Sequence, residues 1–141
     1  MDSLYDKDLL RQAAKATGAG KLTAPQATLM LDNPLCGDRI TVELTFDGAG
    51  AARRVREIGH TVKGCVLCQA SAAIIGQHVK GATAASLQTQ HDLLAAMLKK
   101  QGPLPATAWP ALKAFEPVAD HKSRHNCVLL PFEAVIAAAA S

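Results

Sequence analysis

Hydrophobic and polar residues alternate most regularly over Arg39–Asp47, where every second side chain is apolar. A period of two is typical of a strand with one buried face, so this range is predicted to be a strand. The Asp-Gly-Ala-Gly run of residues 47–50 suits a hairpin turn. A return strand is expected from about Ala52 to Lys63, although its alternation is poorer, and a shorter strand is expected over Ala27–Leu31.

Apolar residues recur at helical spacing in four other stretches. The predicted helices are Leu4–Ala16, Val66–Val79, a helix that Thr83 caps and that stops at Gly102, and an Ala-rich tail from about Pro131 to Ala140. Gly81 is expected to cap the C-terminal end of the second helix.

Prolines complicate the C-terminal third of the chain. The stretch Pro103–Pro117 is predicted to be an irregular connection with one helical turn after Pro110. Pro131 would suit the first turn of the last helix. If that helix begins at Cys127 instead, Pro131 must distort it.

The order of one helix, three strands and then helices predicts an α+β fold, with a three-stranded antiparallel sheet and helices packed on one face. Residues 1–141 are predicted to form a single domain, because this length fits one compact core.

The charge of the chain argues against a nucleic-acid partner. The formal net charge is only +3, and the densest basic cluster, Arg53, Arg54 and Arg56 with Lys63 nearby, has no interleaved aromatic residues for base stacking. We interpret this cluster as a solvated strand face. The alternative is a docking patch for an acidic protein surface.

The expected compartment is the cytoplasm. No apolar run reaches the roughly 18 residues of a membrane span, and the acidic start after Met1 is unlike a signal peptide. Thiols stay reduced in the cytoplasm, so we interpret the four cysteines as metal ligands, reactive thiols or small buried residues rather than as disulfides.

Three cysteines and an aspartate lie at predicted element ends, where side chains from distant parts of the chain can converge. Cys36 and Asp38 flank Gly37 in a loop, and Gly37 lets the backbone come close without a Cβ clash. Cys65 lies where a strand gives way to a helix, whose N-terminus favours a thiolate. Cys127 lies at the entry to the last helix.

Three thiolates and a carboxylate make a plausible tetrahedral set for zinc, and the same thiolates suit iron and sulfide. The simpler interpretation is that these are ordinary buried cysteines. That interpretation fits Cys36 poorly, because a Pro-Leu-Cys-Gly-Asp loop is not placed for core packing. It is the favoured interpretation of Cys68, one turn beyond Cys65.

Three motifs resemble those of the NifU N-terminal family, to which IscU and SufU proteins belong. The motifs are Asn33–Ile40 (NPLCGDRI), Gly64-Cys65 followed by the small-residue helix Gln69–Ala73, and Arg124–Leu130 (RHNCVLL). They occur in family order, and the resemblance extends from about Leu4 to Ala140. The Cys-Gly-Asp-Arg sequence, the long gap from Cys65 to Cys127 and the position of Arg124 look closest to the SufU branch.

The resemblance implies that Cys36, Asp38, Cys65 and Cys127 surround zinc or a [2Fe–2S] cluster. It implies an iron–sulfur cluster assembly protein, either a scaffold or a zinc-bound sulfur acceptor, without independent catalysis of its own. The implied partners are a PLP-dependent cysteine desulfurase, as persulfide donor, and apo iron–sulfur acceptor proteins. Cys36 is the expected sulfur acceptor, and Arg124 is expected to offer positive charge to a thiolate or persulfide.

IscU proteins place a histidine immediately before the last cysteine. Here that position is Asn126, and His125 is one step further away, which argues against a ligand role for His125. The sequence leaves the role of His121 open, and His60 is interpreted as structural rather than as part of the site.

Two enzyme classes are weaker alternatives. A thiol–disulfide redox enzyme would use Cys65 and Cys68, but this leaves Cys36 and Cys127 unexplained. A zinc deaminase needs a glutamate two residues after its histidine, and Val62 stands at that position after His60.

Overall fold

The computed structural model describes residues 7–33 and 37–141 of the chain. Its sheet has three antiparallel strands, β1 (Ala27–Asn33), β2 (Asp38–Asp47) and β3 (Arg54–Lys63), in the order β1-β2-β3. The predicted sheet is therefore confirmed. β2 is central because its alternating apolar residues, among them Ile40, Val42 and Leu44, are all buried on one face.

The poor alternation of the return strand has a structural cause. Thr45 of β2 pairs with Glu57 of β3, but Phe46 pairs with Val55, so Arg56 is an extra residue in the ladder. Such a β-bulge reverses which residues face inward. Before the bulge the odd-numbered residue Val55 is buried, whereas after the bulge the even-numbered residue His60 is buried.

The connection between β2 and β3 is longer than a tight hairpin turn, because a 3₁₀ turn, η2 (Gly50–Ala52), is inserted before β3. Arg53 follows this turn. The sequence suggested a solvated strand residue at this position, but the structure shows a different role for Arg53. Its guanidinium lies 3.7 Å from the ring centroid of Phe46 and donates to the main-chain oxygens of Ala139 and Ser141, at 3.0 and 2.8 Å. Arg53 thus ties the hairpin to the C-terminal end of the chain.

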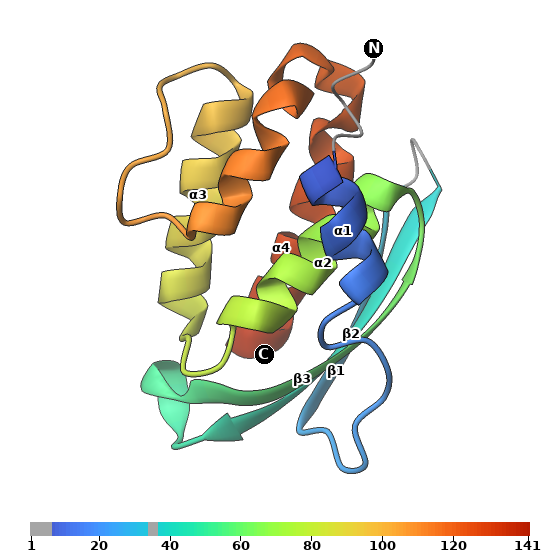
Figure 1. Ribbon diagram of the computed structural model, residues 1–141. Helices are drawn as coiled ribbons and strands as arrows, with labels where there is room; N and C mark the ends of the chain where they lie inside the picture. Colours follow the sequence, from blue (N-terminus) through green and yellow to red (C-terminus); the bar gives the residue numbers. More distant parts are fainter. Residues whose placement is uncertain (1–6, 34–36) are drawn as a thin grey trace.

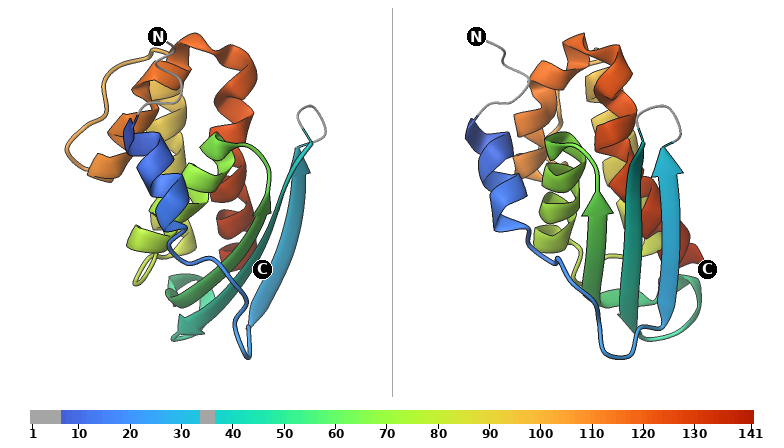
Figure 2. Two further views of the ribbon diagram at one scale, coloured as in Figure 1. Left: turned by 45° about the vertical axis from the view of Figure 1, so that its right-hand side comes forward. Right: turned by 90° about the vertical axis from the view of Figure 1, so that its right-hand side faces the viewer.

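Four α-helices lie on one side of the sheet, as predicted (Figures 1 and 2). They are α1 (Lys7–Lys15), α2 (Val66–His78), α3 (Ala84–Leu98) and α4 (His125–Ala140). α4 packs on β1 and β2, whereas α2 packs on β3 and on α4. α1 packs against α2, and α3 packs against α4. The apolar core therefore lies between the sheet and the α2–α4 pair.

The helix ends match the sequence in part. Thr83 caps α3 in a capping box with Ser86, as its residue type predicts. Gly81 has φ +86° but does not cap α2, because its N–H donates to Val55 of β3 at 2.8 Å. The part of the first predicted helix before Lys7 lies outside the described residues.

The proline-rich connection is more ordered than expected, with a 3₁₀ segment, η3 (Pro110–Asp120), in place of one helical turn. A short 3₁₀ turn, η4 (Lys122–Arg124), leads into α4. Helix α4 begins before Cys127, so Pro131 lies inside the helix and not in its first turn. In the described part of the chain, no helix is both long and apolar enough to cross a membrane.

Candidate metal centre

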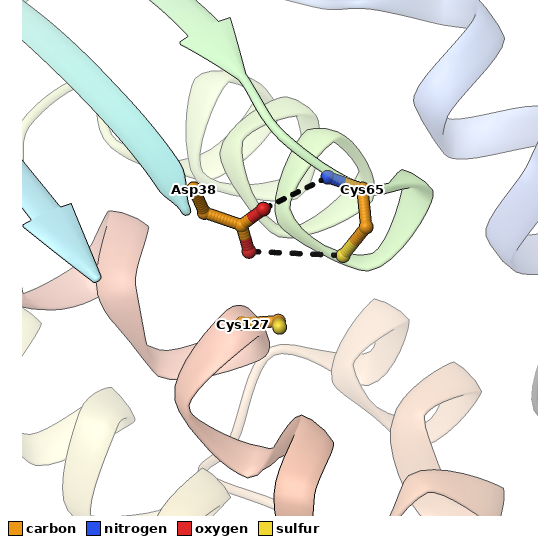
Figure 3. A group of neighbouring side chains, drawn as sticks. All are labelled: Asp38, Cys65 and Cys127. Atoms are coloured by element: carbon orange, nitrogen blue, oxygen red, sulfur yellow. Dashed lines mark hydrogen bonds between the residues drawn. The ribbon is translucent and has the colours of Figure 1, made fainter. Parts of the chain in front are cut away.

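Asp38, Cys65 and Cys127 converge at one end of the sheet, although 89 positions separate the first from the last. Asp38 begins β2, Cys65 lies between β3 and α2, and Cys127 lies in the first turn of α4. One ligand atom from each residue lies within 4.8 Å of the other two. Figure 3 shows the three side chains pointing toward one another.

Asp38 joins β2 to the start of α2. The residue is buried, with 4% of its surface exposed. Oδ1 accepts a hydrogen bond from the backbone N–H of Cys65 at 3.1 Å, and the Cys65 Sγ contacts Oδ2 at 3.8 Å (Figure 3). Both oxygens are turned toward Cys65, and these two contacts fix the orientation of the carboxylate.

Gly64 makes room for that carboxylate. A Cβ on Gly64 would lie 2.5 Å from Oδ1 and 2.8 Å from Cγ of Asp38, which is closer than van der Waals contact allows. The Gly64 carbonyl accepts a hydrogen bond from Gln69 at 3.0 Å, which fixes the junction to α2. Sequence reasoning placed Gly64 in a motif but missed this role, because only the position of Asp38 reveals it.

Cys127 is fully buried and is held in place by the packing of α4 on α2. The Ser71 hydroxyl of α2 donates to the carbonyl of Val128, the next residue, at 2.6 Å. The N-terminal end of α4, where Cys127 lies, carries partial positive charge. The predicted position of Cys127 at a helix entry is confirmed.

Cys36, the fourth predicted ligand, lies outside the described residues. Asp38 stands two residues after it in the sequence. Gly37, between them, has φ +76°, a backbone conformation that favours glycine. No atom among the described residues lies within 4 Å of a Cβ built there, so within this part of the chain the backbone angle is what requires a glycine.

His121 and His125 are near Cys127 in the sequence, but in the described part of the chain neither is in the group of converging ligand atoms. The His125 Nε2 contacts the carbonyl oxygens of Val118 and Ala119 at 3.1 and 3.2 Å, so this ring nitrogen donates to η3. His121 ends η3. Arg124, predicted to offer positive charge, is partly exposed and immediately precedes α4, one turn before Cys127.

His60 and Cys68 lie outside the group of converging ligand atoms in the described part of the chain. His60 is buried, with 5% of the residue exposed, and its Nε2 lies 2.8 Å from the Thr17 carbonyl oxygen, so His60 fastens the segment after α1 to β3. Burial lowers its pKa, with a smaller opposing effect from the Thr17 hydrogen bond. Cys68 is fully buried in the core, as expected.

The donor set fits a soft or borderline metal. Two thiols and one carboxylate whose ligand atoms lie within 4.8 Å of one another suit zinc or iron, whereas magnesium and calcium prefer all-oxygen sites. These three described donors leave room for a fourth ligand. A thiolate from Cys36 would complete a tetrahedral set.

The NifU-like N-terminal domain family has a sequence model that matches residues 4–128. The chain belongs to this family. A solved relative, the N-terminal part of a nitrogen-fixing NifU-like protein from Brucella abortus, is 36% identical, with a TM-score of 0.85 over 97% of this chain and 92% of that chain.

A SufU protein from Fervidobacterium islandicum, described as an iron–sulfur cluster assembly scaffold for the SUF system, is 20% identical. It has a TM-score of 0.84, over 98% of this chain and 97% of that chain, and at this identity the likeness is one of fold. Among curated protein sequences, none matches the chain.

Proposed function

We propose that this NifU-like domain is an iron–sulfur cluster assembly protein that accepts sulfur from a PLP-dependent cysteine desulfurase. The observation that carries the proposal is the convergence of Asp38, Cys65 and Cys127 from three separate parts of the fold. Family membership supports the same function, as does the fold shared with the Fervidobacterium scaffold protein.

In this proposal Cys36, Asp38, Cys65 and Cys127 hold zinc or a [2Fe–2S] cluster. Bound zinc would keep the thiolates ordered and deprotonated, whereas the cluster would be the cargo that the protein assembles and hands on. The near-complete burial of Asp38 and Cys127 supports a closed site, because burial excludes competing water.

Asp38 is the one hard donor of the set, and its bond to a soft metal is weaker than that of a thiolate. Its hydrogen bond with the Cys65 N–H keeps the carboxylate in position if a ligand leaves. Arg124 would contribute positive charge beside the Cys127 turn, where a thiolate or persulfide carries negative charge.

Cys36 is the proposed sulfur acceptor. Its thiolate attacks the outer sulfur of the desulfurase persulfide, the sulfur–sulfur bond of the donor breaks, and the desulfurase cysteine leaves as a thiolate. Cys127 is fully buried, so a partner protein cannot reach it without moving α4. Cys65 is only partly exposed, which makes it less accessible than a loop thiol.

The proposed setting is the cytoplasm, with the desulfurase as donor and apo iron–sulfur proteins as acceptors of the finished cluster. The reducing cytoplasm would keep the four cysteines available as thiols. Nucleic acid and membranes are not expected partners, given the small net charge.

Mass mapping of the persulfide tests the proposal. Trypsin separates Cys36 (residues 22–39) and Cys127 (residues 125–141) from the peptide 64–80, which carries Cys65 and Cys68. After incubation with desulfurase, PLP and cysteine, we expect one added sulfur atom on the first of these peptides. Cys36→Ser should abolish sulfur acceptance, while the control Cys68→Ser should retain it.

Two results would contradict the acceptor assignment. One is a persulfide on residues 64–80 or 125–141 in the wild-type protein, with the Cys36 peptide unmodified. The other is full sulfur acceptance by Cys36→Ser.

A further inference from the structure

Cys68 is a thiol three residues after Cys65 that the proposed function does not use. It is fully buried, and in the described part of the chain it lies outside the group of converging ligand atoms. It forms a Cys-x-x-Cys pair with Cys65, which is the N-cap residue of α2. Cys68 is the third residue of that helix.

The N-cap residue and the third residue of a helix face each other across the first turn. α3 of this protein demonstrates the geometry, because Thr83 and Ser86 occupy the same two positions. The Thr83 N–H donates to the Ser86 hydroxyl at 2.9 Å, and the Ser86 N–H donates to the Thr83 hydroxyl at 3.1 Å. The backbone of α2 therefore brings the side chains of Cys65 and Cys68 within reach of each other.

Cys65 uses a different direction in this structure. Among the described residues its side chain makes no capping hydrogen bond to α2, and its Sγ is turned toward Asp38 and Cys127 (Figure 3). The Cys65 backbone is held on both sides, by Asp38 at its N–H and by the Gln69 N–H at its carbonyl. Rotation about the Cα–Cβ bond of Cys65 changes the direction of its sulfur without moving this backbone.

Cys127 is the competing partner for Cys65, since their sulfurs lie within 4.8 Å. A disulfide needs a sulfur–sulfur bond of about 2.05 Å with suitable Cβ positions. Cys65 and Cys127 stand on separate elements, and the 2.6 Å hydrogen bond from Ser71 to Val128 holds α4 at its distance from α2. Cys68 is part of the same helical turn as Cys65, so that pair needs no movement between elements.

We propose that Cys65 and Cys68 form a redox-active pair that closes to a disulfide when the metal centre is empty. Closure removes Cys65 from the site, so metal binding and oxidation exclude each other. The proposal rests on the proposed function only in taking Cys65 to be a metal ligand. It gives Cys68 a role in protecting or switching off the empty site.

The oxidant is a small disulfide such as oxidised glutathione. The Cys65 thiolate, which is partly exposed, attacks one glutathione sulfur, and one glutathione leaves as a thiolate. The Cys68 thiolate then attacks the Cys65 sulfur of this mixed disulfide, and the second glutathione leaves. Two protein thiols become one disulfide, and one glutathione disulfide becomes two thiols.

Peptide mass mapping of chelated, reduced protein treated with oxidised glutathione tests the proposal. We expect peptide 64–80 to lose two hydrogens while remaining a single peptide, because it contains both Cys65 and Cys68 and no other cysteine. Protein loaded with zinc before oxidation should keep both thiols. In Cys68→Ser the loop cannot close, so Cys65 should retain glutathione as a stable mixed disulfide.

The proposal is overturned if oxidation of the metal-free wild type links peptide 64–80 to 125–141, or leaves Cys65 glutathionylated as in Cys68→Ser. Zinc binding by the reduced wild type and by reduced Cys68→Ser provides an independent measurement. Cys68→Ser should bind zinc as the wild type does, and loss of zinc binding would instead make Cys68 a ligand and overturn the proposal. Failure of the redox pair would leave the persulfide test of Cys36 unaffected.

Discussion

At the scale of single residues, the site depends on contacts that orient its donors. Asp38 has both carboxylate oxygens turned toward Cys65, and the missing side chain of Gly64 provides the necessary space. Groups that orient metal ligands often matter nearly as much as the ligands themselves. Gly64 is therefore the neighbour whose replacement disturbs the site most directly.

Gly64→Ala should weaken zinc binding by about 10–100-fold, because the new Cβ displaces the Asp38 carboxylate. Competition with a chromogenic chelator measures this affinity. Gly102→Ala is the control, since Gly102 has φ +141° and no described atom within 4 Å of a Cβ built there. The control should lose about 1–3 kcal/mol of stability and keep its zinc affinity. Equal zinc affinity in Gly64→Ala and wild type would contradict this account.

Residue types predicted the candidate site better than they predicted side-chain directions. Asp38, Cys65 and Cys127, which converge in the structure, were singled out by their positions at element ends and by the motifs that resemble the NifU family. The direction in which His125 points, toward carbonyls of η3, follows from tertiary packing and leaves no signal in the sequence. The role of Ser71 was missed for the same reason, because its partner Val128 is on another helix.

At the scale of elements, the sequence predicted the types of element better than their ends. The alternation of β2 is clear, whereas the bulge at Arg56 hides the inward face of β3. α4 starts at His125 although Pro131 lies inside it, because tertiary packing on the sheet and on α2 outweighs the unfavourable proline. The 3₁₀ segment η3 was underestimated, because closely spaced prolines usually indicate irregular chain.

The contact between α3 and α4 should depend on pH through His91. The His91 Nε2 lies 3.4 Å from Oε2 of Glu133 in α4, and the His91 Nδ1 lies 3.1 Å from Oδ1 of Asp92. The pKa of His91 is raised above its ordinary value, chiefly by the hydrogen bond with Glu133. Burial opposes this rise, and Asp92 adds to it. Folding therefore favours the protonated ring, and this contribution is fully present below the unfolded pKa of about 6.5.

His91→Gln should accordingly destabilise the protein most at about pH 6 and least at about pH 8.5, because the wild-type advantage is lost as the pH rises through the folded pKa. Urea unfolding of both proteins across this range measures the difference in free energy. Comparing variants removes the contributions of His60 and His78, whose pKa values burial lowers. A difference that does not change with pH would rule out the protonated contact.

At the scale of the whole molecule, the candidate centre joins parts of the fold that are distant in sequence. It lies where β2 begins, where β3 passes into α2, and where α4 begins. A metal bound there would connect the sheet to both helices that cover it. Binding to the folded chain and not to the unfolded chain raises the free energy of unfolding.

Metal removal should therefore lower the melting temperature. At free zinc about 100 times the Kd, binding contributes about 2.7 kcal/mol, which corresponds to roughly 10 °C for a chain of this size. Calorimetry with and without chelator measures the shift. Cys65→Ser should show little shift and the control Cys68→Ser the full one. An unchanged melting temperature after complete chelation of the wild type would show that the site does not stabilise the fold.

The identity of the ligands is tested most directly by X-ray absorption at the zinc edge, on anaerobically prepared protein carrying one zinc per chain. We expect three sulfur ligands at about 2.3 Å and one oxygen at about 2.0–2.2 Å. Cys36→Ser should lose one sulfur ligand, and Asp38→Ala should lose the carboxylate oxygen while keeping all three sulfurs. A zinc shell made only of nitrogen and oxygen, or a Cys36→Ser spectrum identical to that of the wild type, would contradict the proposed centre.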